Sequence, residues 1–159
     1  MRVIVAILLT FASLSAITNK QIKTAHEVYN EAKKWTTYPT TITQIAFVES
    51  SFGYYLIGDD GNSLGVTQVQ VATAKWLANK DDRLKYLLSF SDKKVASLLL
   101  EDMKLNVKVT SILFEYHRIR YGYESAKSRH NGGAYNVRYL NKMANCKKFV
   151  VKILRRKIR

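Results

Sequence analysis

The sequence of 159 residues is poor in cysteine, proline, glycine and acidic side chains, with counts of one, one, seven and 12. Because the lone cysteine, Cys146, can neither close an internal disulfide nor form a cysteine-based zinc cage, a disulfide-stapled scaffold and a zinc finger are excluded. The content of 47% hydrophobic residues excludes a disordered or low-complexity chain. The length fits one domain that can bury a hydrophobic core.

The balance of charge is strongly basic, because 26 Lys and Arg residues against 12 Asp and Glu give a formal net charge of +14. Such a balance predicts attraction to a polyanion or an anionic surface, without identifying it. In the last thirteen residues, Lys147 to Arg159, seven cations alternate with apolar residues, which predicts a basic amphipathic tail helix over residues 146–159. Two interpretations stay open: binding to an anionic envelope surface, or a helix docked by its apolar face with its charges in water.

The N-terminus has the pattern of an export signal. Arg2 precedes a short apolar run, Val3 to Leu14, which is too short to span a bilayer, and small residues follow at Ser15 and Ala16. We therefore expect residues 1–16 to be a signal peptide, the alternative being an ordinary buried helix or strand. No cysteine lies beside the run to take a lipid, so the expected location is the periplasm or the cell envelope.

Residues 17–145 are predicted to form one mainly α-helical domain. Apolar residues at helical spacing predict a first helix over residues 19–35, capped by Thr18 or Asn19. A break over residues 36–41 contains the only proline, and Thr40 or Thr41 is expected to cap a second, short helix that carries Glu49.

A short extended or β element is predicted near residues 58–71, after this second helix stops at Gly53. Residues 58–62 are dense in turn formers, and residues 66–71 alternate as an extended segment does. Helical patterns follow at residues 72–78 and, as one long apolar-periodic stretch, from Ser91 to Gly122.

Glu49 is the candidate for chemistry. A carboxylic acid on the inner side of a short helix, followed by Ser50, Ser51 and Phe52, loses water on several sides, and loss of hydration disfavours a charged carboxylate. A protonated carboxyl group can act as a general acid. On spacing alone, a salt-bridged or solvent-facing glutamate is the commoner interpretation.

Three separated segments resemble the soluble lytic transglycosylase domain, the goose-lysozyme-like family that cleaves bacterial peptidoglycan. Residues 49–53 (Glu-Ser-Ser-Phe-Gly) resemble the family's Glu-Ser motif, and residues 65–69 (Gly-Val-Thr-Gln-Val) with Ala-Thr-Ala at 72–74 resemble its Gly-Leu-Met-Gln-Ile block. Residues 129–133 (Arg-His-Asn-Gly-Gly), with Val137 and Tyr139 after them, are similar to its Ala-Tyr-Asn-Ala-Gly block. An Asn-Val pair at 106–107 stands where the family has an Asn-Ile that opens a helix.

The resemblance implies a lysozyme-like fold and a single catalytic glutamate, Glu49. In the family this residue protonates the glycosidic oxygen between N-acetylmuramic acid and N-acetylglucosamine, then takes the proton of the muramic C6 hydroxyl, which closes a 1,6-anhydro ring. No cofactor or metal is implied, and the expected partner is the glycan strand, bound by a monomer. The residues that the resemblance places at the substrate are Ser51, Gly65, Thr67, Gln68, His130 and Asn131.

Two residues depart from the family pattern, since His130 replaces a tyrosine and Thr67 replaces a methionine. A histidine there can hydrogen-bond the acid or the sugar, and its protonation would add a charge that depends on pH. The alternative is a turn residue packed under a loop. Tyr54, Tyr55 and Tyr135 are candidate stacking surfaces for sugar rings, or core residues.

Two other functions stay open. Asp59 or Asp60, if either reaches the sugar opposite Glu49, would make a hydrolysing lysozyme, because ordinary glycosidases use two carboxyl groups; the simpler interpretation is that they stabilise a turn. A non-catalytic cationic protein would explain the charge but not the ordered motifs. The export segment argues against a nucleic-acid partner inside the cell.

Overall fold

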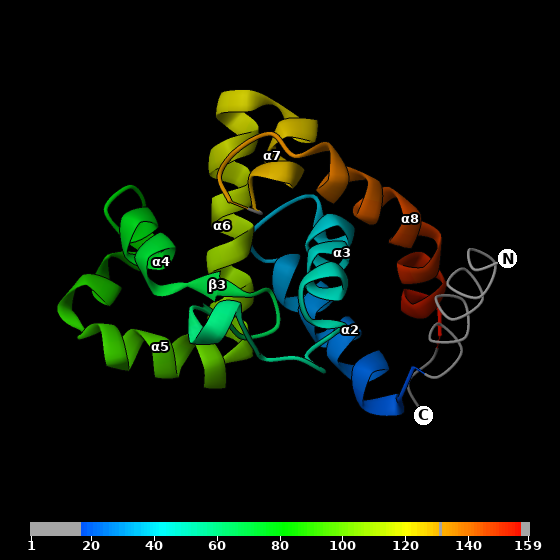
Figure 1. The fold of residues 1–159 in the computed structure, drawn as a ribbon, viewed down its shortest axis with the longest axis horizontal. Coiled ribbons are helices and arrows are strands. Elements are labelled where there is room, and N and C mark those ends of the chain that lie inside the picture. Colours follow the sequence, from blue (N-terminus) through cyan, green and yellow to red (C-terminus); the bar gives the residue numbers. More distant parts are fainter. Residues whose placement is uncertain (1–16, 131, 157–159) are drawn as a thin grey trace, which may run out of the picture.

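The computed structural model describes residues 17–130 and 132–156. This part of the chain is mainly helical with one small antiparallel sheet, as predicted (Figure 1). The expected signal peptide, residues 1–16, lies outside the described residues. The elements in chain order are α2 (Asn19–Ala32), α3 (Pro39–Ser50), β1 (Ile57–Gly58), η2 (Asp59–Gly61), β2 (Ser63–Leu64), β3 (Val69–Gln70), α4 (Val71–Ala78), η3 (Asp82–Ser89), α5 (Asp92–Glu101), α6 (Met103–Tyr121), α7 (Tyr123–Arg129) and α8 (Val137–Leu154).

The first two helices differ from the prediction at their ends. Thr18 caps α2 in a capping box with Gln21, as expected, but the helix ends at Ala32 instead of residue 35. Helix α3 begins at Pro39, so the expected cap at Thr40 or Thr41 is wrong: Tyr38 is the N-cap. Proline suits the first helical position because its φ is already helical and its missing N–H would have no partner there.

The predicted β element is confirmed as a three-stranded antiparallel sheet within residues 57–70. Ile57 pairs with Leu64, and Leu64 pairs with Val69. The expected extended segment over residues 66–71 is shorter than predicted, because only Val69–Gln70 is a strand and Val71 already begins α4. Residues 65–68 instead form a tight turn, with the Gln68 N–H donating to the Gly65 carbonyl at 3.1 Å.

The long helical stretch predicted from Ser91 to Gly122 is divided into α5 and α6. Asp102 ends α5 with extended backbone angles and caps α6, its Oδ1 accepting from the Leu105 N–H at 3.0 Å. An aspartate that caps a helix has a non-helical backbone, so the apolar period continues while the helix does not.

Helix α6 lies between α2, α3 and α8 on one side and α4 and α5 on the other (Figure 1), and it contributes to two hydrophobic clusters. Its Val107 and Phe114 join the first cluster with α2, α3 and α8, and its Val109 and Ile112 join the second cluster with α4, η3 and α5. The two halves of the fold therefore meet along one helix, and a cleft can open between them.

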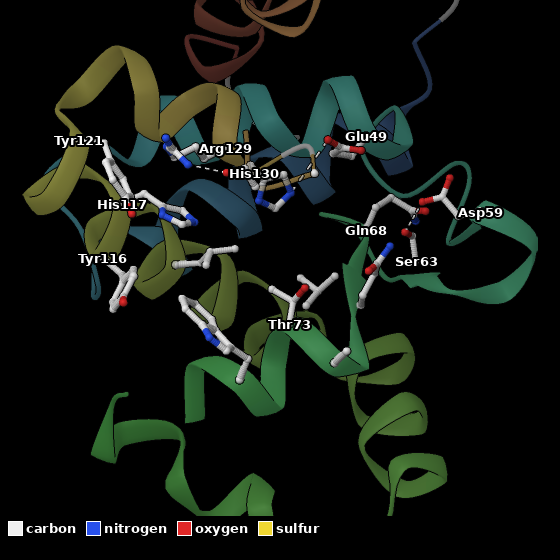
Figure 2. Close-up of a pocket in the computed structure, with 17 residues that line it drawn as sticks. Glu49, Asp59, Ser63, Gln68, Thr73, Tyr116, His117, Tyr121, Arg129 and His130 are labelled. Carbon is white, nitrogen blue, oxygen red and sulfur yellow. Dashed lines mark hydrogen bonds and ion pairs between the residues drawn. The ribbon is translucent and has the colours of Figure 1, made fainter. Parts of the chain in front are cut away.

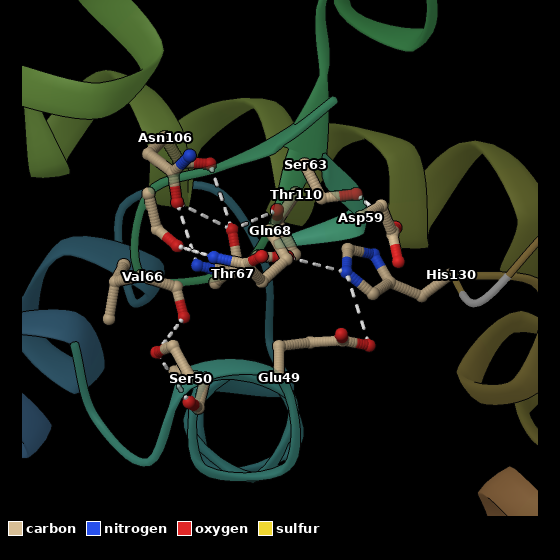
Figure 3. Close-up of polar contacts among 12 residues, drawn as sticks. Glu49, Ser50, Asp59, Ser63, Val66, Thr67, Gln68, Asn106, Thr110 and His130 are labelled. Carbon is tan, nitrogen blue, oxygen red and sulfur yellow. Dashed lines mark hydrogen bonds and ion pairs between the residues drawn. The ribbon is translucent and has the colours of Figure 1, made fainter. Parts of the chain in front are cut away.

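A buried amide joins α6 to the sheet. Asn106 is fully buried, and its Nδ2 donates to the carbonyls of Leu64 (2.8 Å) and Leu99 (3.1 Å). Its Oδ1 accepts from the backbone N–H (2.9 Å) and the hydroxyl (2.7 Å) of Thr67 (Figure 3). Gly65 allows this contact, because a Cβ on it would lie 2.4 Å from the Asn106 Nδ2, and its φ of +77° disfavours any side chain.

The predicted basic tail is the end of a longer helix. Helix α8 begins at Val137, so the expected boundary between residues 145 and 146 lies inside it. Its apolar face is buried in the first cluster through Met143, Cys146, Val150 and Ile153, so the helix is docked. Its cations point outward, and no helix among the described residues is long and apolar enough to cross a membrane.

We predict that Asn106→Leu lowers the free energy of unfolding by about 3 kcal/mol, because the substitution leaves buried partners on three segments without hydrogen bonds. Urea unfolding followed by circular dichroism measures the change. Asn145→Ala, on the exposed face of α8, is the matched control and is expected to change stability by about 0.5 kcal/mol or less. Equal stability of both variants would contradict the role given to Asn106.

Candidate active site

A cleft of about 600 Å³ opens between the two halves of the fold (Figure 2). Its volume is in the range of small-molecule sites in proteins. The residues that line it come from the end of α3, the sheet, α4, α6 and the end of α7: Glu49, Asp59, Ser63, Gln68, Val69, Gln70, Ala72, Thr73, Trp76, Leu113, Tyr116, His117, Tyr121, Arg129, His130, Gly132 and Gly133.

Glu49 lies in the last turn of α3 and faces this cleft (Figure 2). Its side chain is only 16% exposed, and its Oε1 is buried without a hydrogen-bond partner among the described residues. A buried carboxyl oxygen without a partner has lost hydration without compensation, which costs free energy. A ligand in the cleft can supply the missing hydrogen bond, so this atom marks a place for a reacting or binding group.

The serine after Glu49 holds the end of α3 in place. The Ser50 hydroxyl donates to the Val66 carbonyl at 2.6 Å and accepts from the Gly53 N–H at 2.8 Å (Figure 3). It is buried and ties the helix to the turn at residues 65–68, a role that the sequence analysis missed. Ser51, predicted to contact substrate, instead has left-handed backbone angles and contacts Gln21 of α2, outside the cleft.

His130 lies beside Glu49, and its side chain is 6% exposed. Its Nε2 is 2.9 Å from the Thr67 carbonyl oxygen and 4.0 Å from the Glu49 Oε1 (Figure 3). Because a carbonyl oxygen only accepts hydrogen bonds, Nε2 carries the hydrogen. The Nε2 hydrogen is therefore directed at the Thr67 carbonyl, and this contact holds the ring beside the Glu49 carboxyl group.

The other residues predicted at the substrate have different places. Gln68 lines the cleft, and its Nε2 donates to the Gly65 carbonyl at 2.8 Å. Thr67 is fully buried, with its hydroxyl bonded to Asn106 and Thr110, so its side chain does not face the cleft. Gly65 is buried as well and acts in the turn.

The remaining candidates are outside the cleft or outside the described residues. Asn131 is not among the described residues. Tyr54, Tyr55 and Tyr135 are exposed and do not line the cleft, so none of the three is a core residue.

Tyr139, near the start of α8, is a further neighbour of Glu49. Its hydroxyl is buried without a hydrogen-bond partner among the described residues. Burial, and after it the charge of the Glu49 carboxylate, raises the pKa of Tyr139 well above its ordinary value. The phenol thus stays protonated and neutral beside the acid. The sequence motif included Tyr139, but nothing in its spacing predicted this contact.

A second carboxyl group lies in the same cleft. Asp59 lines it and has a φ of +48°, while its Oδ2 accepts a hydrogen bond of 2.5 Å from the Ser63 hydroxyl (Figure 2). Asp60, its neighbour, is exposed and does not line the cleft.

The end of the cleft near α6 is aromatic and cationic. His117 is 9% exposed and stacks on Trp76 with ring centroids 6.5 Å apart. Burial, then the charges of Arg129, His130 and Arg120, lowers the pKa of His117 to about 4. Its Nδ1 is buried without a partner among the described residues.

Across residues 17–130 and 132–156, no group of three His, Cys, Asp or Glu side chains is placed to hold a metal ion.

We predict that His117 titrates with a midpoint near pH 4 in the folded protein, well below the ordinary 6.5 of histidine. The unfolded chain binds a proton more readily between these values, so folding stability falls as the pH decreases from about 6.5 to 4. A titration of the histidine ring protons by NMR measures the midpoint, with His117→Gln to assign the resonance. A midpoint near 6.5 would mean that the ring is not desolvated.

No family model, curated protein or solved structure matches this chain. The resemblance to soluble lytic transglycosylases thus stays a prediction from the sequence motifs.

Proposed function

We propose that the protein is a lytic transglycosylase that cleaves the β-1,4 bond between N-acetylmuramic acid and N-acetylglucosamine in peptidoglycan, and that its domain is lysozyme-like. The observation that carries the proposal is the buried Glu49 oxygen without a partner in a large cleft. Three motifs that are far apart in sequence contribute Glu49, Gln68 and His130 to this one cleft.

Glu49 is proposed to act alone as acid and then as base. In its protonated form it donates to the glycosidic oxygen, and an oxocarbenium-like centre forms on the muramyl ring. The resulting carboxylate takes the proton of the C6 hydroxyl, whose oxygen closes the 1,6-anhydro ring without water. The Glu49 Oε1 accepts no hydrogen bond from the described residues, so it is available for both transfers.

His130 and Tyr139 position the acid in this proposal. Each places a polar hydrogen near Glu49: the His130 Nε2 lies 4.0 Å from the Glu49 Oε1, and burial keeps the Tyr139 hydroxyl protonated. A donor near the carboxylate stabilises the anion that forms after the first proton transfer. His130 stands where the family has a tyrosine, but its Nε2 hydrogen is bonded to the Thr67 carbonyl, so the Tyr139 hydroxyl is the donor left for the carboxylate.

Hydrolysis is the second candidate, and Asp59 is the observation that favours it. Its carboxyl group lines the same cleft as Glu49, which a two-carboxylate glycosidase requires. The Ser63 hydroxyl already occupies one of its oxygens, and the left-handed backbone of Asp59 is typical of a turn residue. We therefore place the lytic reaction first.

The site of action is proposed to be the cell envelope, reached by the expected export of the chain. Helix α8 carries exposed Lys147, Lys148, Lys152 and Arg155 around Val151, a surface that suits an anionic envelope polymer or lipid phosphate. A non-catalytic cationic binder would use the same surface. It would leave the unpartnered acid in the cleft without a role.

We predict that Glu49→Gln lowers the clearing of purified peptidoglycan by about 10²–10⁴-fold, because the amide cannot donate or accept the transferred proton. A zymogram and a turbidity assay measure the loss. Glu101→Gln removes an exposed carboxyl group at the end of α5 and is expected to clear peptidoglycan at the wild-type rate. Equal clearing by wild type and Glu49→Gln would end the catalytic proposal.

We predict that Asp59→Asn still releases 1,6-anhydro ends, at a rate within about tenfold of wild type, because one carboxyl group completes the lytic reaction. Mass spectrometry of the muropeptides separates anhydro ends from reducing ends. Asp60→Asn is the control, since it is the adjacent, exposed acid. Reducing ends from wild type, together with an inactive Asp59→Asn, would establish a hydrolysing lysozyme instead.

A further inference from the structure

The α6 end of the cleft has no part in the proton transfers proposed above. Trp76, His117, Tyr121 and Arg129 line it, and Figure 2 places the labelled His117 and Tyr121 on the side away from Asp59. His117 offers a buried Nδ1 that has no partner among the described residues. Aromatic walls with a few placed polar atoms are typical of a ligand subsite.

Arg129 gives this end its charge. Its guanidinium stacks on the Tyr121 ring, with Cζ 3.9 Å from the ring centroid. Nε donates to the Ser125 hydroxyl at 3.1 Å and Nη1 to the Gly133 carbonyl at 2.5 Å, whereas Nη2 has no partner among the described residues. The group is thus held in place by neutral acceptors, and no acidic side chain of residues 17–130 and 132–156 forms an ion pair with it.

The acids among the cleft-lining residues are Glu49 and Asp59, on the other side of the cleft from Tyr121 (Figure 2). The cleft therefore has an acidic half and a cationic half. A fixed, unneutralised guanidinium in a half-buried place binds a carboxylate better than a neutral amide or hydroxyl group.

We propose that Trp76, His117, Tyr121 and Arg129 form a subsite for the carboxylate-bearing substituent of a muramyl residue, so that the cleft selects anionic glycan strands over neutral ones. The subsite rests on the proposed function, because that function places a glycan in the cleft. Arg129 contacts the carboxylate, and the neutral His117 accepts or donates one hydrogen bond with the same substituent. Such a carboxylate has two sources: the lactyl group of a strand without stem peptides, or the stem peptide itself.

The test is binding by calorimetry to Glu49→Gln protein, which holds glycans without cleaving them. Three probes separate the sources: a soluble muropeptide oligomer with stem peptides, the same oligomer stripped of its stems by an amidase, and neutral chitotetraose. Adding Arg129→Gln is expected to weaken binding of at least one anionic probe by about 10- to 100-fold and to leave chitotetraose within about twofold. The probe that loses affinity identifies the source of the carboxylate.

Two further variants separate charge from local folding. Arg129→Lys keeps the charge and is expected to recover part of the lost affinity, although it loses the planar stack on Tyr121. Arg138→Gln removes an equal charge from an exposed position on α8, outside the cleft, and is expected to bind all probes as the parent does.

The outcomes distinguish this proposal from the function on which it rests. An equal loss of affinity for chitotetraose and the anionic probes, or no loss for any probe, overturns the subsite while wild-type clearing of peptidoglycan leaves the function intact. Failure of wild type to clear peptidoglycan, with no binding of any probe by the Glu49→Gln protein, overturns both.

Discussion

The buried amide of Asn106 is the contact on which the cleft depends. It fixes the turn at residues 65–68 against α6, and the carbonyls of that turn hold the side chains around the acid. The Val66 carbonyl accepts from Ser50, next to Glu49, and the Thr67 carbonyl accepts from His130. One side chain with all its hydrogen bonds satisfied thus sets the distance between α3 and the end of α7, since both are bonded to neighbouring peptides of one turn.

The same arrangement explains why an unsatisfied acid is tolerated. Two polar side chains near Glu49 donate their hydrogen bonds to backbone carbonyls instead of to the acid. His130 donates to the Thr67 carbonyl, and Ser50 donates to the Val66 carbonyl. The acid is enclosed but not neutralised, which costs stability locally. The two hydrophobic clusters on either side of α6 offset that cost, so the fold tolerates a buried polar atom without a hydrogen bond.

The sequence predicted the positions of helices and strands well, but it predicted poorly which way individual side chains point. Helical periodicity found α2 and α3, and turn formers located the sheet, because both signals are local. The break between α5 and α6 at Asp102 was not predicted, because the apolar periodicity continues through it and the capping contact is made by a side chain. The motif that contains Thr67 was placed correctly near the cleft, yet its side chain faces Asn106, since the left-handed Gln68 and Gly65 turn the chain there. The neighbours of His117 come from α4, from α6 itself and from the end of α7, so no spacing along the sequence could reveal its burial.

The positive charge of the chain acts in two separate ways. The exposed cations of α8 lie on a face to which no cleft-lining residue belongs, and charges in water are screened within about 8 Å at physiological salt. They can raise the local concentration of an anionic polymer, but they cannot distinguish one substituent of that polymer from another. Arg129 is a single, half-buried charge held between Tyr121 and the backbone. Because it is fixed in place, it interacts strongly only with a charged group that binds next to it. In the proposed function, attraction to the cell wall and selection of the glycan strand would therefore be properties of different residues, and each could be altered without the other.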